Sequence, residues 1–125
     1  MSPDDIRELF SVFGPVTVRR MFGGAGVYAD GTMFALLYDG VIYLKAGECN
    51  AAAFDREALE PFTYMTKDGK RGVTSYRRMP DRLYDDPHEL AEWSRDALAA
   101  ALQGRARKSP ASGKLAKRAK RAFKL

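Results

Sequence analysis

The sequence predicts an α+β fold of two layers with an antiparallel sheet, in the order helix, four strands, helix, two strands, helix. Segments with strand-like patterns follow one another in runs instead of alternating with helices, which favours α+β over α/β. Three Asp-Gly pairs, at 30–31, 39–40 and 68–69, lie between residues that favour strands. Since Asp-Gly is typical of tight turns between antiparallel strands, we expect a hairpin at each pair.

The first predicted helix begins at Pro3. Ser2 can cap the free amides, Pro3 suits the first helical position, and the carboxylates of Asp4 and Asp5 favour the positive end of the helix dipole. One apolar face follows at helical spacing, formed by Ile6, Leu9, Phe10 and Phe13. The helix is expected to end at residues 14–15, which are Gly-Pro.

A strand, a sharp glycine turn and a second strand are predicted next. Residues 16–20 alternate apolar and polar side chains, as a half-buried strand does. Three glycines, here called the glycine elbow, allow the backbone to turn sharply or to pass close to other atoms. They are Gly23, Gly24 and Gly26. The Asp-Gly pairs then define the remaining strands. The expected strands are residues 16–21, 26–29, 32–38, 41–45, 62–66 and 72–78.

Two further helices are predicted. Residues 48–59 are rich in alanine, and Pro61 closes this short helix. The last helix starts with Asp86, Pro87 and Glu89, in the order of a capping box. Its apolar residues at helical spacing are Leu90, Trp93, Ala97, Leu98, Ala101 and Leu102.

The charge of the chain is strongly asymmetric. The formal net charge is +5, but residues 105–125 hold nine Lys/Arg and no Asp/Glu. This leaves 12 of the 21 Lys/Arg against all 16 Asp/Glu in residues 1–104. We therefore expect an acidic domain over residues 1–103 and a flexible basic tail over residues 104–125. The positive charge of the tail suits contacts with the phosphates of DNA or RNA that do not depend on the base sequence. The predicted contact residues are Arg105, Arg107, Lys108, Lys114, Lys117, Arg118, Lys120, Arg121 and Lys124.

Composition excludes several classes of protein. With Cys49 as its single cysteine and His88 as its single histidine, the chain has no internal disulfide and no Cys/His zinc site. No apolar run approaches a membrane span, and the acidic N-terminus is unlike a secretory signal. We expect a cytoplasmic protein with no metal, cofactor or membrane partner.

Several separated segments resemble the TfoX N-terminal domain family, which is found in bacterial regulators of natural competence and in small stand-alone proteins. They cover roughly residues 4–102. The first contains Arg19, Arg20, Met21, Phe22, Gly23, Gly24 and Gly26, and the others are residues 33–36, 42–45, 61–64, 75–80 and 93–97. The resemblance implies a fold similar to secretion-chaperone-like domains and no enzymatic activity. Competence-type members carry a second, helical domain, in place of which this chain has the basic tail.

The glycine elbow has an alternative interpretation as a phosphate or nucleotide site. Glycine loops that bind phosphate precede a helix and carry Gly-Lys-Ser/Thr or Gly-x-Gly-x-x-Gly spacing. Here a strand follows and neither spacing is present, which favours a bulge or tight connection. A small-ligand site at Arg19 or Arg20, Gly23 and Gly24 stays open as an alternative.

The remaining polar residues favour structural roles. One of Arg19 and Arg20 is expected to pair with a carboxylate of the domain while the other is at the surface. Arg77 and Arg78 are interpreted as solvated hairpin charges, with a shared basic edge as the alternative. His88 is expected to be exposed, Cys49 semi-buried and Trp93 packed in the core, while the paired carboxylates at 4–5 and 85–86 are helix caps. No catalytic residue is predicted.

The sequence thus predicts a non-enzymatic regulatory or interaction module. Its domain is expected to supply a protein–protein surface, through a homodimer, and its tail to attract nucleic acid. A chaperone-like dimer that binds a peptide is the second alternative, which rests on fold analogy alone.

Overall fold

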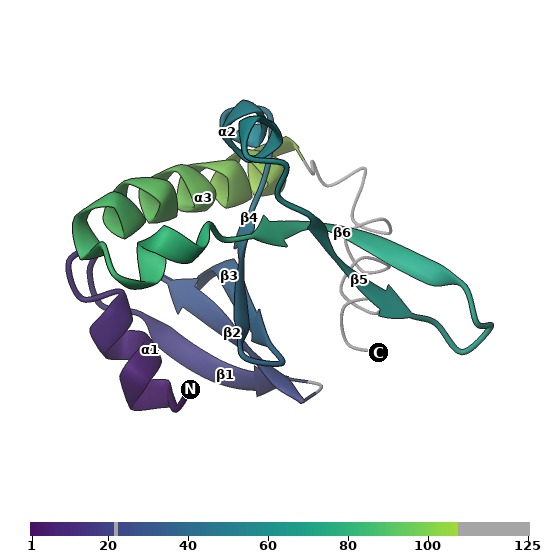
Figure 1. Ribbon diagram of the computed structural model, residues 1–125, viewed down its shortest axis with the longest axis horizontal. Coiled ribbons are helices and arrows are strands. Elements are labelled where there is room, and N and C mark those ends of the chain that lie inside the picture. The colour runs from purple at the N-terminus through teal and green to yellow at the C-terminus, as the bar shows by residue number, and fades with distance from the viewer. Residues whose placement is uncertain (22, 108–125) are drawn as a thin grey trace.

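The computed structural model describes residues 1–21 and 23–107 and confirms the predicted α+β class and element order (Figure 1). A short 3-10 helix, η1, was not predicted. The elements are α1 (Pro3–Leu9), β1 (Thr17–Met21), β2 (Gly24–Ala29), β3 (Thr32–Tyr38), β4 (Val41–Lys45), α2 (Ala51–Arg56), β5 (Pro61–Met65), β6 (Arg71–Arg78), η1 (Asp81–Tyr84) and α3 (Pro87–Arg107). None of the helices within these residues has the length and apolar character needed to span a bilayer.

All six strands form one antiparallel sheet in the order β1-β2-β3-β4-β6-β5. The first two Asp-Gly turns have positive φ at both residues, 49° and 76° at 30–31 and 51° and 76° at 39–40. These are the angles that a two-residue hairpin turn requires. In the third turn only Gly69 has positive φ, and the Thr66 amide donates to Lys70 across a wider loop. All three hairpins are confirmed, although the third uses a different turn.

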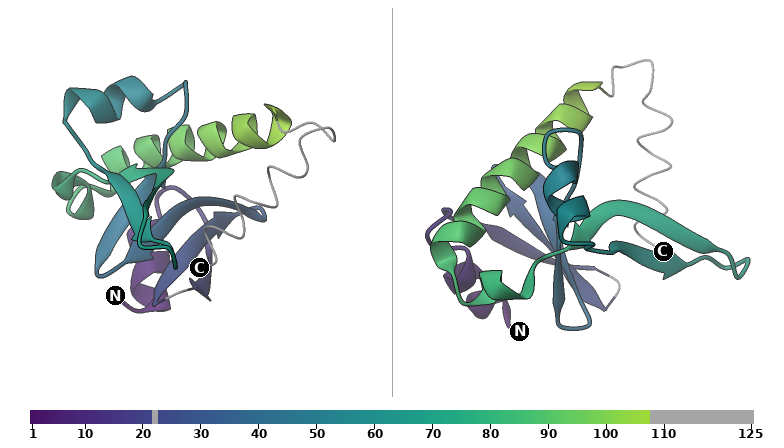
Figure 2. Two further views of the ribbon diagram at one scale, coloured as in Figure 1. Left: turned by 90° about the vertical axis from the view of Figure 1, so that its right-hand side faces the viewer. Right: turned by 45° about the horizontal axis from the view of Figure 1, so that its top comes forward.

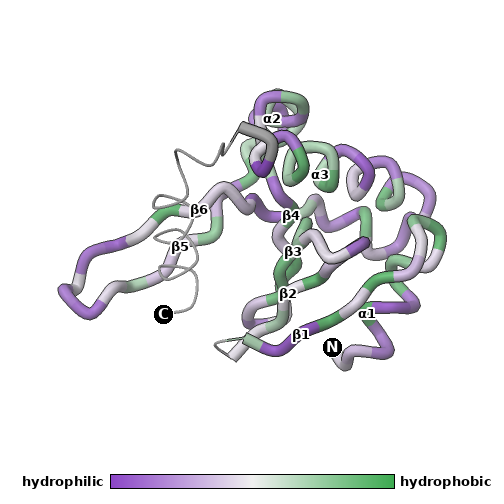
Figure 3. The backbone as a smooth tube through the Cα atoms, turned by 180° about the vertical axis from the view of Figure 1, so that it is seen from behind, coloured by the Kyte–Doolittle hydropathy of each residue, from purple (hydrophilic) through white to green (hydrophobic). Residues whose placement is uncertain are grey.

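The β5–β6 hairpin projects from the body of the domain (Figures 1 and 2). Only the end of β6 pairs with β4, through residues 76–78. The tip of the hairpin is largely hydrophilic (Figure 3), while Met65 and Val73 on its strands are 64% and 66% exposed. This hairpin therefore adds surface to the domain rather than core.

The core lies between the sheet and the helices. α3 packs against β3 and β4, and α1 lies against β1 on the same side of the sheet (Figures 1 and 2). β3 contains a bulge, since Val27 pairs with Ala35 and Tyr28 with Met33, which leaves Phe34 between them. The bulge allows Phe34 to be fully buried, with its ring centroid 5.5 Å from that of Phe10.

The helix starts follow the predicted caps in part. In α1, Ser2 and Asp5 form a reciprocal capping box. α2 begins at Ala51, three residues later than predicted, because the Asn50 side chain is used by the preceding loop. Its Oδ1 accepts from the Gly47 amide at 2.7 Å, and its Nδ2 donates to the Lys45 carbonyl at 2.9 Å. α3 runs to Arg107, so the predicted domain boundary at residue 103 falls inside this helix.

Candidate functional site

The glycine elbow is a tight hairpin connection followed by strand. Met21 pairs with Gly24, and Gly23 between them has φ of 74°. Gly24 and Gly26 belong to β2, which is paired with β1 on one side and β3 on the other. Their amides therefore lie within the sheet, not at the start of a helix where a phosphate would bind.

Close packing explains the two strand glycines. A Cβ on Gly24 would overlap the carbonyl oxygen of Leu37, and a Cβ on Gly26 would lie 3.0 Å from Met21 Sδ, Met33 Sδ and a ring carbon of Tyr28. Real Cβ atoms rarely make such contacts, so only glycine lets the neighbouring groups approach this closely. Phe22, the remaining residue of the motif, lies outside the described residues.

Arg19 and Arg20 do not form the predicted structural ion pair. Both are exposed, and within residues 1–21 and 23–107 neither lies within ion-pair distance of a carboxylate. The guanidinium of Arg19 instead lies over the ring of Tyr28, 5.2 Å from its centroid. This cation–π contact needs no buried carboxylate.

The structural role belongs to Arg77, which the sequence assigned to the solvated surface. Its Nε and Nη2 donate to the Leu59 carbonyl at 3.0 and 2.7 Å, and its Nη1 donates to Asp55 at 2.6 Å. The guanidinium also lies 5.5 Å from the centroid of the Phe54 ring. Arg77 thereby holds α2 and the start of β5 against β6.

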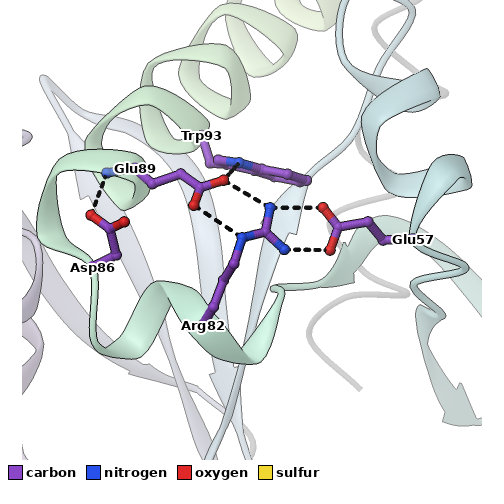
Figure 4. A network of polar contacts seen from close by, with 5 residues as sticks. All are labelled: Glu57, Arg82, Asp86, Glu89 and Trp93. Carbon is purple, nitrogen blue, oxygen red and sulfur yellow. Dashed lines mark hydrogen bonds and ion pairs between the residues drawn. The ribbon is translucent and has the colours of Figure 1, made fainter.

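Arg82 forms a second network that the sequence analysis missed (Figure 4). It donates to both carboxylate oxygens of Glu57, at 2.6 and 2.8 Å, and to both of Glu89, at 3.0 and 2.7 Å. Trp93 Nε1 donates to Glu89 at 3.3 Å. Only half of the capping box predicted at 86–89 forms. Asp86 caps the Glu89 amide, but the Glu89 carboxylate accepts from the charged Arg82 side chain, which is the stronger partner.

The hydrogen bonds of this network shift the pKa values of Glu57, Glu89 and Arg82. Hydrogen bonds from Arg82 hold the pKa of Glu57 and of Glu89 below the ordinary glutamate value. Hydrogen bonds from the same carboxylates raise the pKa of Arg82. The three groups therefore stay charged at neutral pH and tie η1 to the chain after α2 and to the start of α3.

We expect Arg82→Gln to lower the free energy of unfolding more at about pH 6 than at about pH 3. A carboxylate with a lowered pKa stabilises the fold above its ordinary pKa, and this contribution disappears as the pH falls through the lowered value. Urea unfolding at the two pH values measures the difference. Arg95→Gln, at an exposed position of α3, is the control. If Arg82→Gln lowers the free energy of unfolding equally at both pH values, the charged contacts of Arg82 do not stabilise the fold.

The other predicted residues occupy unremarkable positions. His88 is exposed and Trp93 packs edge-on against Phe54, with centroids 5.1 Å apart, as predicted. Cys49 is exposed rather than semi-buried. Among the described residues, no three His, Cys, Asp or Glu side chains are grouped to hold a metal ion.

The tail residues fall into two groups. Arg105 and Arg107 belong to α3, and Nη1 of Arg105 donates to the buried Thr32 hydroxyl at 2.6 Å. Arg105 therefore helps to fix the end of α3 to β3. The other seven contact residues predicted from sequence lie outside the described residues. They are Lys108, Lys114, Lys117, Arg118, Lys120, Arg121 and Lys124.

The sheet surface opposite the helices is rich in tyrosine, and we call it the tyrosine face. Along β2, β3 and β4 its residues alternate with core residues such as Val27, Leu37 and Leu44. It is formed by Arg19, Met21, Tyr28, Met33, Leu36, Tyr38, Tyr43, Lys45, Phe62, Tyr64, Tyr76 and Arg78. None of the described helices covers it (Figures 1 and 2).

Contacts between aromatic rings, and between rings and neighbouring groups, join the tyrosine face into one surface. The Phe62 ring lies 5.3 Å from that of Tyr38 and 5.1 Å from that of Tyr43, centroid to centroid. Tyr76 is nearly buried, its hydroxyl donates to the Met33 carbonyl at 3.3 Å, and burial raises its pKa, so the phenol stays neutral. Lys45 lies over the Tyr76 ring. The sixth tyrosine, Tyr84, lies elsewhere and accepts from the Ile42 amide.

Comparison with known proteins agrees with the sequence motifs. The family described as TfoX N-terminal domain matches residues 8–101. Over 97 residues the chain is 30% identical to Protein Sxy of Escherichia coli (strain K12). That alignment covers 78% of this chain and 46% of Sxy, so the chain spans about half the length of this relative.

Proposed function

Because the chain belongs to the TfoX N-terminal domain family, we propose that it is a non-enzymatic regulatory protein, related to competence-type regulators, whose basic tail contacts nucleic acid. Its cytoplasmic location and its homodimeric state are part of the same proposal. Membership of the family supports the regulatory role, and the charge distribution of the chain supports the contact with nucleic acid.

The geometry of the charged side chains supports a structural rather than a catalytic use. Arg77 donates to the Leu59 carbonyl and to Asp55, and Arg82 donates to Glu57 and Glu89. A general acid or base must be able to exchange a proton with a substrate. These groups are instead hydrogen-bonded to one another and to the backbone, as groups that hold elements together are.

The charge of the tail supports the contact with nucleic acid. Seven Lys/Arg follow the end of α3, with no Asp/Glu among residues 108–125. Small residues separate these cations, which suits contacts along a phosphate backbone. Since the Arg105 side chain is hydrogen-bonded to Thr32 within the domain, we assign the contact with nucleic acid to the residues after Arg107.

We expect binding to duplex DNA to weaken steeply with salt. If roughly five tail cations contact phosphates, the logarithm of the affinity falls with the logarithm of the salt concentration at a slope of about −4.5. Fluorescence anisotropy of a labelled duplex over a salt series measures this slope. Replacing Lys114, Lys117, Arg118, Lys120 and Arg121 with Gln is expected to bring the slope close to zero.

A truncation after Arg107 is the second arm of this experiment, because it keeps all of α3 and the bond from Arg105 to Thr32. The core residues all lie before this point. Truncation at residue 103 would confound loss of the tail with loss of the helix end. Unchanged duplex affinity in both the Gln variant and the truncation would refute the tail as the contact.

A further inference from the structure

Charge is segregated between the sheet and the rest of the domain. The strands that the structure describes contain no Asp or Glu. Their cations are Arg19, Arg20, Lys45, Arg71, Arg77 and Arg78. The acidic residues lie in helices, turns and loops. Arg19, Lys45 and Arg78 lie on the tyrosine face, so a domain that is acidic in sum presents three cations on this surface, which suits an anionic ligand.

Aromatic rings are gathered on the same surface. Five of the six tyrosines and Phe62 lie on the tyrosine face. Tyr38 is 43% exposed and is the most exposed ring of the tyrosine face. Aromatic rings on a sheet, with cations beside them, are the groups on which the bases of single-stranded nucleic acid stack.

A shallow hollow of about 240 Å³ lies at the base of the β5–β6 hairpin, on the tyrosine face. Its lining includes the rings of Tyr38, Tyr43 and Phe62 and the side chain of Arg78. Arg78 has a 46% exposed side chain and one loose ion pair, 3.6 Å from Asp81. The hollow thus combines three aromatic residues with a partly exposed cation.

Two carboxylates at the edge of the hollow fit the same ligand. Asp39 and Glu60 also line it. Carboxylate oxygens accept hydrogen bonds from the amino groups of bases. Rings for the base plane, acceptors for its amino group and Arg78 for a phosphate are therefore brought together by β3, β4, β5 and β6.

We propose that the tyrosine face binds single-stranded nucleic acid, with one base stacked in the hollow beside Tyr38 and phosphates contacted by Arg78 and Arg19. The inference rests on the proposed function, in which nucleic acid is the ligand, and names the strand type and the site. A second copy of this chain fits less well, since two basic faces would repel each other.

The test uses the full chain and measures anisotropy of a labelled oligodeoxycytidine, whose bases carry an amino group, and of a labelled duplex at low salt. Tyr38→Leu keeps apolar volume but removes the ring, and we expect about tenfold weaker binding of the single strand. Tyr38→Phe keeps the ring and should bind like the parent. Arg78→Ala should weaken single-strand binding, whereas Arg95→Ala, on the helical side, should not.

The outcomes separate this inference from the tail proposal. Weaker single-strand binding by Tyr38→Leu with unchanged duplex binding supports the site. Equal single-strand binding by Tyr38→Leu, Arg78→Ala and the parent overturns it, even where the tail variant loses duplex binding. Weaker single-strand binding by Tyr38→Leu and Arg78→Ala, together with unchanged duplex binding by the tail variant, refutes the tail proposal alone. If light scattering shows a dimer that Tyr38→Leu dissociates without changing nucleic-acid affinity, the face is a protein interface and the inference is wrong.

Discussion

Gly24→Ala is expected to destabilise the domain by about 3 kcal/mol, close to the largest effect of any single methyl group added to a packed interior. The new Cβ would overlap the carbonyl oxygen of Leu37 on the neighbouring strand. Backbone in the middle of a sheet cannot move away without breaking ladder hydrogen bonds on both sides of β2. The free energy of unfolding, measured with urea and checked by circular dichroism, should fall accordingly.

Gly104→Ala is the matched control, because the chemical change is the same and the surroundings differ. A Cβ on Gly104 would meet nothing within 4 Å, and the residue lies inside α3. Alanine is the better helix former, so this variant should be more stable by about 0.5 kcal/mol. Equal urea midpoints for the parent and Gly24→Ala would show that β2 and β3 do not approach as closely as described.

Arg77→Met is expected to cost about 2 kcal/mol of unfolding free energy, since it leaves the Leu59 carbonyl without its charged donor. The Arg77 side chain is only 21% exposed, so water replaces the lost hydrogen bonds poorly. Methionine keeps the apolar contact with Phe54 and isolates the effect of the guanidinium. Because Arg77 holds α2 to the sheet, hydrogen exchange should rise first in residues 51–59.

Arg78→Met is the control for this prediction. It removes the same charge from the adjacent residue, on the opposite face of β6, where the side chain is half exposed and its ion pair is loose. Such surface substitutions change stability by less than about 0.5 kcal/mol. If Arg77→Met and Arg78→Met have the same midpoint, the contacts of Arg77 with Leu59 and Asp55 do not stabilise the fold.

Features determined by neighbouring residues were predictable. The start of α1 depends on Ser2 and Asp5, three positions apart, and two of the hairpins depend on adjacent Asp and Gly residues. Glycine at 24 and 26 also marked a place of close approach. In the caps and turns the residues that cause the structure are separated by at most three positions, so their pattern is visible without the fold, whereas the groups that approach Gly24 and Gly26 include residues of β3.

Which arginines hold the domain together could not be predicted. The sequence analysis assigned that role to Arg19 or Arg20, but Arg77 and Arg82 fill it. Three of their partners, Asp55, Glu57 and Leu59, lie 18 to 25 residues away, and only Glu89 is near its arginine, seven residues from Arg82. From the sequence alone, each arginine could pair with any of the carboxylates. The course of the chain through α2 to β5 and β6 decides which partners lie next to Arg77 and Arg82.

The sequence by itself determined the order of the strands and α-helices, the first two Asp-Gly turns, the starts of α1 and α3 and the basic character of the tail, because these follow from local backbone preferences and from charge counts. The tertiary structure decided which side of the sheet the helices cover and which aromatic rings share the other side. The alternation in β2, β3 and β4 marks two faces but does not say which is covered. The strand order brings Phe62 next to Tyr38 and Tyr43. This order depends on the pairing of β6 with β4, which joins segments far apart in the sequence and cannot be read from local patterns.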